Sequence, residues 1–326
     1  MSSATTKQSR LPRLNVSLVA TMGVCLLLYL LAGAKFHQFF TGKVFLDLLN
    51  ENAYLGICAV GMTFVILSGG IDLSVGSMIG LTGIASAVMI TNLGWHPLPT
   101  FLVMLLVGAL FGAAHGALVR WFELPPFLVT LAGMFMARGL ALVISQESVT
   151  VKHPWYSQVA DARLPIGPGV APPTIALLVV FAVAVYLGTY TKFGRNTYAV
   201  GGNENSALLM GLPCGATKVW VYVWSGFCSA LAGVVHILAL PGGDANAGMG
   251  LELDAIAAAV IGGTLLSGGV GHVGGTFFGL LILAVIQTAI TFKGNLNSWW
   301  IKIAIGLLLL VFILLQRAIQ RRAERK

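Results

Sequence analysis

The sequence predicts an all-α integral membrane protein with about ten transmembrane helices. Hydrophobic residues fill 57% of the 326 positions and charged residues only 9%, whereas a soluble domain carries about 25% charged residues. The apolar residues form runs close to the roughly 20 residues that cross a bilayer as a helix. A soluble fold could not bury this much apolar surface, so we expect lipid to cover it.

These runs divide the chain into ten expected spans. Their ranges are 14–34, 46–68, 73–92, 97–119, 125–144, 173–190, 217–240, 253–270, 273–292 and 298–316. The expected organisation is a cytoplasmic N-terminal tail over 1–13, a polytopic transmembrane domain over 14–316, a cytoplasmic loop over 191–216 inside it, and a basic cytoplasmic C-terminal tail over 317–326.

The basic residues predict the orientation of the chain. An even number of spans places both termini on one side, and Lys and Arg concentrate on the cytoplasmic side of membrane proteins. With the termini inside, the cytoplasmic segments hold Lys7, Arg10, Arg13, Arg120, Lys192, Arg195, Lys218, Arg317, Arg321, Arg322, Arg325 and Lys326. The outer segments hold only Lys35, Lys43, Lys152, Arg163, Lys293 and Lys302. The net charge of +8 thus follows membrane topology, and we expect no nucleic-acid partner.

Two glycine-rich segments interrupt the apolar runs. LSGGIDLSVGSMIG (67–80) and LSGGVGHVGGTFFG (266–279) align with each other, which indicates an internal repeat of the kind common in transporters. Irregular backbone at membrane depth is tolerated only where protein or a water-filled cavity satisfies it. The segments are therefore either tight turns at the cytoplasmic surface or part of a pathway. Their candidate residues are Ser68, Gly69, Gly70, Asp72, Ser74, Gly268 and Gly269.

A few polar residues within the expected spans are further candidates. Arg138 needs a carboxylate or carbonyl partner, for a structural pair or for a pathway role. Asp72 and Asp254 start helices, where capping is the simpler role than contact with a substrate. Asn52 and Gln287 could hydrogen-bond a neutral polyol, and so few charges suit a neutral polar substrate better than an ion.

Small residues recur at four-residue spacing in the expected span 97–119. Gly108, Gly112 and Gly116 share one helix face. Lipid gives no hydrophobic drive for helices to associate, so such faces favour close packing. We expect a neighbouring helix to approach this face closely.

The loop 191–216 contains one expected short helix. Asn203 can cap a short helix that Gly211 and Pro213 end. Such a helix either docks a soluble partner or lies in the membrane interface. The candidate residues of this docking loop are Gly201, Gly202, Asn203, Glu204, Asn205, Leu209 and Gly211.

The sequence carries almost no catalytic signature. LSGG also occurs in ATP-binding cassettes, but no G-x-x-x-x-G-K-[ST] phosphate loop is present, and Val44 follows the only Gly-Lys pair. No zinc-type cluster and no G-x-S-x-G elbow occurs. The four cysteines predict free thiols. We therefore expect no catalytic residue, no bound metal and no cofactor of the chain's own.

Three long motifs resemble the ribose/xylose/arabinose-type permeases of ABC transporters. They are AVGMTFVILSGGIDLSVGS (59–77), FGRNTYAVGGNENSALLMGL (193–212) and LDAIAAAVIGGTLLSGGVGHVGGT (253–276). The runs NAYLGICAVGMTFVILSGGIDLSVGS (52–77) and NSWWIKIAIG (297–306) are similar to those of galactofuranose permeases in particular.

The resemblance implies a permease subunit that moves a monosaccharide, galactofuranose or a related pentose or hexose, across a bacterial inner membrane by alternating access. It implies a second permease copy or a paralogous permease, a cytoplasmic ATPase that uses ATP, and a periplasmic sugar-binding protein as partners, with lipid around the dimer. It also implies that 191–216 is the ATPase-coupling loop. There are two alternatives. One is an ion-coupled secondary transporter, which Asp72 in a glycine break would suit. The other is a membrane-embedded enzyme.

Overall fold

The computed structural model describes residues 16–165, 167–294 and 299–324. All named elements in these ranges are helices, which confirms the predicted all-α class. The expected N-terminal tail over 1–13 lies outside the described residues, as do residues 325 and 326 of the expected C-terminal tail. The rest of that tail continues the last helix as far as Glu324.

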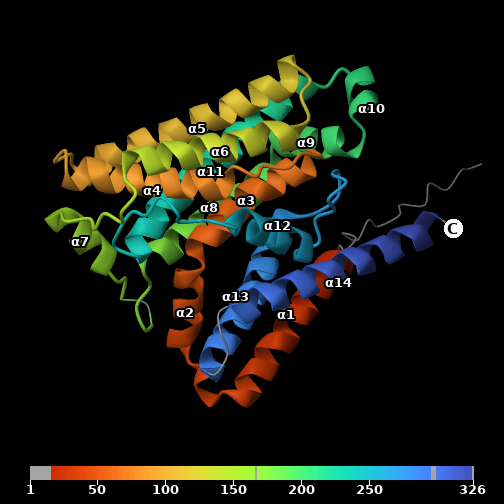
Figure 1. Ribbon diagram of the computed structural model, residues 1–326. Coiled ribbons are helices and arrows are strands. Elements are labelled where there is room, and N and C mark those ends of the chain that lie inside the picture. Colours follow the sequence, from red (N-terminus) through yellow and green to blue (C-terminus); the bar gives the residue numbers. More distant parts are fainter. Residues whose placement is uncertain (1–15, 166, 295–298, 325–326) are drawn as a thin grey trace, which may run out of the picture.

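The helices follow one another with short connections (Figure 1). They are α1 (Val16–Lys35), η1 (His37–Phe40), α2 (Gly42–Glu51), α3 (Ala53–Leu67), α4 (Val75–Thr91), α5 (Pro97–Trp121), α6 (Pro126–Ile144), α7 (Pro154–Asp161), α8 (Pro172–Tyr190), α9 (Lys192–Gly202), α10 (Glu204–Leu209), α11 (Cys214–Ala239), α12 (Leu251–Ile261), α13 (Val273–Lys293) and α14 (Trp299–Glu324).

The count of ten spans is not confirmed. Among the described residues, six helices are long and apolar enough to cross a membrane, and a seventh span results if α2 and α3, bent by 56°, count as one. Val75–Thr91 and Trp299–Leu314 are shorter apolar helices.

The expected span over 253–270 is wrong in its length. The helix ends at Ile261, because Gly263 adopts a left-handed φ of 94° and the chain turns away. α12 has only 11 residues and is too short to cross a bilayer alone.

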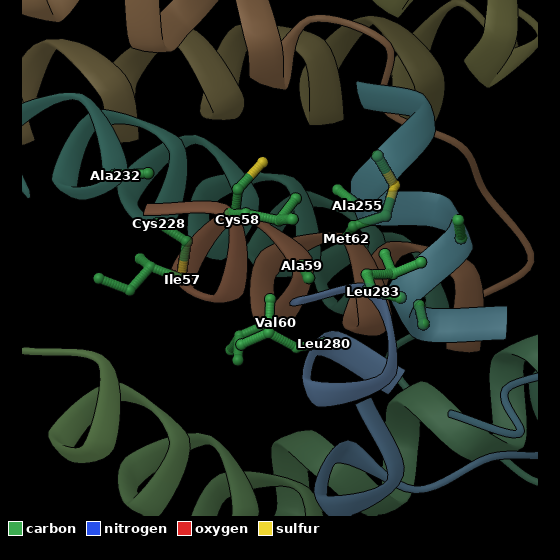
Figure 2. Close-up of a cluster of buried hydrophobic side chains, with 14 of the residues drawn as sticks. Ile57, Cys58, Ala59, Val60, Met62, Cys228, Ala232, Ala255, Leu280 and Leu283 are labelled. Atoms are coloured by element: carbon green, nitrogen blue, oxygen red, sulfur yellow. The ribbon is translucent and has the colours of Figure 1, made fainter. Parts of the chain in front are cut away.

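The helix α3 lies at the centre of the protein. Fourteen of its 15 residues are buried, as expected for a helix that is apolar on all sides. Figure 2 shows Ile57, Cys58 and Val60 of α3 among side chains of α11 and α13, including Cys228 and Leu280. All four cysteines are free and buried, as the sequence predicts.

The helix α5 has one face for packing and one face exposed to the surroundings. Leu98, Leu102, Leu106 and Leu110 recur every four residues and are all more than half exposed, which suits contact with lipid. On the other face, a Cβ at Gly112 would stand 2.0 Å from the carbonyl oxygen of Tyr222 in α11. Gly108 and Gly116 meet α11 in the same way, so the predicted close packing of this face is confirmed.

Candidate functional site

Glycines from three distant segments meet at one place, which we call the glycine junction: Gly69, Gly201, Gly202, Gly268 and Gly269. The backbone amide of Gly269 donates a hydrogen bond to the carbonyl oxygen of Leu67 at 2.9 Å. This bond joins the loop after α3 to the loop after α12. The end of α9 packs against both loops at the same point.

One aligned pair of glycines in the two repeats adopts the same conformation, whereas in the next pair Gly269 is left-handed and Gly70 is not. Gly69 has a φ of 84° and Gly268, its counterpart in the alignment, a φ of 83°. Left-handed backbone of this kind favours glycine. The match in conformation agrees with the internal repeat inferred from the sequence.

The junction leaves no room for side chains. A Cβ at Gly201 would stand 1.8 Å from the Leu67 carbonyl oxygen, and one at Gly268 would stand 2.9 Å from the Gly69 α-carbon. A Cβ at Gly269 would stand 2.4 Å from the Gly202 α-carbon. By contrast, a Cβ at Gly202 itself would meet nothing closer than 4.0 Å. Bulk at Gly201 is therefore more damaging than bulk at Gly202, and the sequence alone does not separate the two.

Tyrosine and threonine hydroxyl groups hold the loop backbones of the junction. The Tyr198 hydroxyl of α9 donates to the Gly271 carbonyl at 3.1 Å. Burial raises the pKa of Tyr198, so the phenol stays protonated and able to donate. The Ile71 carbonyl accepts from Thr130 of α6 at 3.2 Å and from Tyr222 of α11 at 3.5 Å. These bonds satisfy carbonyl groups of the irregular backbone.

The carboxyl group of Asp72 fixes the first loop to its neighbours. It accepts hydrogen bonds from the Ser74 amide at 3.0 Å, the Ser74 hydroxyl at 2.6 Å and the Ser225 hydroxyl of α11 at 2.7 Å. Asp72 is only 1% exposed. The capping role expected for Asp72 is wrong, because Ser74 occupies the N-cap of α4 and no side chain caps that helix. The Ser68 hydroxyl donates to the Val65 carbonyl of its own helix.

The loop 191–216 forms the short helix that its residues predict. The Asn203 side chain accepts a hydrogen bond from the Ser206 amide at 2.8 Å, and Gly211 follows the helix with a φ of 76°. Glu204 pairs with Lys218 of α11 at 2.6 Å. Asn205 is exposed, as are Leu209 at 89% and Met210 at 69%. Adjacent apolar side chains this exposed suit contact with a protein partner or with the membrane interface.

Arg138 holds an irregular segment between α11 and α12. Its guanidinium donates to the carbonyl oxygens of Ala245 and, at 2.9 Å, of Ala247. These carbonyls precede Gly248 and Gly250, whose φ values of 74° and 78° turn the chain into α12. The partner predicted for Arg138 is thus a pair of carbonyls.

Replacement of Arg138 by methionine is expected to lower the stability of the protein by about 1–3 kcal/mol, because two carbonyls lose a charged donor. Thermal unfolding of the purified protein in detergent measures this change. Arg138→Lys, which retains the charge and one donor position, is expected to lie between the unchanged protein and Arg138→Met. Equal melting temperatures for Arg138→Met and the unchanged protein would contradict the assignment.

The structure brings Asn52 and Gln287 together. Both line a polar cavity of about 310 Å³, at the bend between α2 and α3. Asp254 lies at the same cavity and pairs with Lys302 of α14 at 2.6 Å. The expected capping role of Asp254 is wrong, since Gly250 occupies the N-cap of α12 and no side chain caps that helix.

Several residues of the site carry no signal in the sequence. Tyr198, Tyr222 and Ser225 reach the loops only because α9 and α11 pack there, and a serine or tyrosine in an apolar run has many ordinary roles. The Gly70 position is closed by Tyr222, whose hydroxyl would lie 2.5 Å from an added Cβ. In the described ranges no group of three or more His, Cys, Asp or Glu side chains could hold a metal ion.

Comparison with known proteins gives consistent matches along the chain. Residues 44–314 match the family described as branched-chain amino acid transport system / permease component. The chain is 47% identical to the inner membrane ABC transporter permease protein YjfF of Escherichia coli strain K12, over 94% of this chain and 93% of that protein. It is 36% identical to the fructose import permease protein FruG of Bifidobacterium longum, over 96% and 94%. It is 40% identical to the ribose import permease protein RbsC of Haemophilus influenzae, over 85% and 86%. No solved structure matches the chain.

Proposed function

We propose that the chain imports a monosaccharide by alternating access driven by a separate ATPase. The premise is that the chain belongs to the family of branched-chain amino acid transport system permease components and, within it, to the sugar ABC transporter permeases. The similar proteins are permease subunits and not enzymes, and none supports an ion-coupled transporter. The proposed substrate is galactofuranose or a related pentose or hexose.

The glycine junction is the observation that carries this proposal. It connects the docking loop 191–216 directly to the loops that follow α3 and α12. A displacement of α10 by an ATPase therefore reaches the backbone of both repeats without an intervening side chain. Binding energy outside the membrane can then change the arrangement of helices inside it.

The proposed orientation has both termini in the cytoplasm of a bacterium with an inner membrane. In Figure 1, α10 and the C-terminal end of α14 lie toward one end of the molecule and α7 toward the other. Among the described residues, Lys192 and Arg195 lie in α9, and Lys218 pairs with Glu204 of α10, which supports this orientation under the positive-inside rule. An ATPase would then meet α10, and a periplasmic sugar-binding protein would meet the α7 side. A second permease, identical or paralogous, would complete the pathway.

The experiment that tests the function is uptake of labelled sugars into vesicles. The vesicles contain this chain with its ATPase, a second permease and the binding protein, and galactofuranose, ribose, xylose and fructose are compared with and without ATP. Uptake that needs both ATP and the ATPase supports the proposal. Uptake by this chain alone on a proton or sodium gradient would contradict it.

Loss of the apolar surface of α10 is expected to detach the ATPase. In a Leu209→Glu, Met210→Glu double variant, ATPase affinity should fall at least about tenfold, since burial of each apolar side chain contributes about 1.5–3 kcal/mol. Both side chains are exposed in the permease, so its melting temperature should not change. Co-purification with the ATPase measures the loss.

The matched control for this double variant is Leu93→Glu, at an exposed leucine on the opposite end of the protein. The control should keep full ATPase association. If the double variant co-purifies with the ATPase as well as the control does, α10 is not the docking helix.

A further inference from the structure

The polar cavity at the α2–α3 bend is formed where two helix discontinuities meet. One wall is Asn52, at the 56° bend between α2 and α3. The opposite wall is the left-handed turn at Gly248 that leads into the half-length helix α12. Transporters place substrate sites at discontinuous helices of this kind, because irregular backbone is tolerated where it lines a cavity.

The volume of the cavity suits a small molecule. It measures about 310 Å³, at the lower limit of the roughly 300–1,000 Å³ typical of small-molecule sites. A compact polar ligand such as a monosaccharide fits this size, whereas a disaccharide or a peptide would need more room.

The side chains around the cavity present both donors and acceptors. Gln287 of α13 is exposed to it and offers both halves of an amide. Asp254 and Lys302 add an acceptor and a donor, and they neutralise each other through their 2.6 Å ion pair. A balanced charge leaves no net attraction for an ion, while a sugar hydroxyl can both donate to Asp254 and accept from Lys302.

An aromatic pair forms another part of the wall. The Tyr54 and His236 rings meet edge to face, with centroids 4.9 Å apart and planes at 85°. Each belongs to a different helix, α3 and α11, and both line the cavity. Ring faces of this kind contact the C–H groups of a sugar, so polar and apolar sides of a pyranose or furanose both find partners.

We infer that this cavity is a binding station for one neutral monosaccharide, with Gln287, Asp254 and Lys302 as its hydrogen-bonding residues and Tyr54 and His236 as its aromatic wall. The inference rests on the proposed function and adds the site and the substrate class to it.

The test is direct binding of labelled sugars to the purified full-length permease. The probes are galactofuranose, ribose, xylose and fructose, each used alone. Gln287→Met and Asp254→Asn should each raise the dissociation constant of the bound sugar about tenfold, the change that one or two lost hydrogen bonds produce. Gln146→Met, at an exposed glutamine away from the cavity, is the matched control and should bind as the unchanged protein does.

The outcomes separate the site from the function. Melting temperatures without sugar should be equal for the unchanged protein and Gln287→Met, since that side chain makes no core contact that its loss would expose. Suppose that the complete transporter imports a sugar. If both cavity variants then bind that sugar as tightly as the unchanged permease, or if the permease binds no sugar saturably, the proposed binding station is wrong and the proposed function stands. If the complete transporter imports none of the sugars, the proposed function fails and the station fails with it.

Discussion

Uptake driven by ATP is expected to fall about tenfold or more when Gly201 is replaced by alanine. The new Cβ would stand 1.8 Å from the Leu67 carbonyl oxygen and 2.7 Å from the Gly269 amide nitrogen. Both are backbone atoms that cannot rotate away, so α9 must separate from the two loops, at a cost of about 1–3 kcal/mol. The loss should appear in vesicle uptake while the ATPase remains bound, because α10 itself is unchanged.

The neighbouring substitution Gly202→Ala is the control for this prediction. Its Cβ would find its nearest atom at 4.0 Å, so most of the uptake should remain. A Gly201→Ala transporter with uptake equal to that of Gly202→Ala would show that the junction does not transmit movement from the docking loop.

Replacement of Asp72 by alanine is expected to destabilise the protein by about 3–5 kcal/mol, the second large effect. The change removes an acceptor that binds the Ser74 amide, the Ser74 hydroxyl and the Ser225 hydroxyl. Hydrogen bonds to a carboxylate contribute roughly 1.5–3 kcal/mol each, and the abandoned donors stay buried. Thermal unfolding in detergent measures the effect.

Two milder variants set the scale for Asp72→Ala. Asp72→Asn keeps an oxygen for Ser74 and offers an amide to the Ser225 hydroxyl, so it should lose much less stability. Ser225→Ala removes one of the three bonds and should fall between them. A melting temperature for Asp72→Ala as high as that for Asp72→Asn would contradict the structural role of the carboxyl group.

The sequence predicts those parts of the fold that depend on local pattern. Apolar runs locate most helices, and Asn203 with Gly211 defines α10 because capping and helix termination are local properties. The alignment of 67–80 with 266–279 pairs Gly69 with Gly268, and these two residues share a left-handed conformation. These features need no knowledge of what packs against them.

The remaining parts depend on tertiary packing. Residues 262–270 include four glycines. The structure ends α12 before them, where Gly262 packs against Gly275 of α13 and Gly263 turns the chain. Asp254 looks like a cap from its position, yet its partner Lys302 is 48 residues away. The difference between Gly201 and Gly202 exists only once the loops are in place.

The glycine junction also bears on how a transporter of this kind could acquire a new substrate. Its contacts are made by backbone atoms and one residue type, so a substitution there can break the linkage between ATPase and helices but cannot adjust it. Inherited variation in what is carried must therefore accumulate among side chains elsewhere, such as those of the polar cavity. The coupling to the ATPase at the glycine junction and the substrate selectivity of the polar cavity are therefore free to evolve separately.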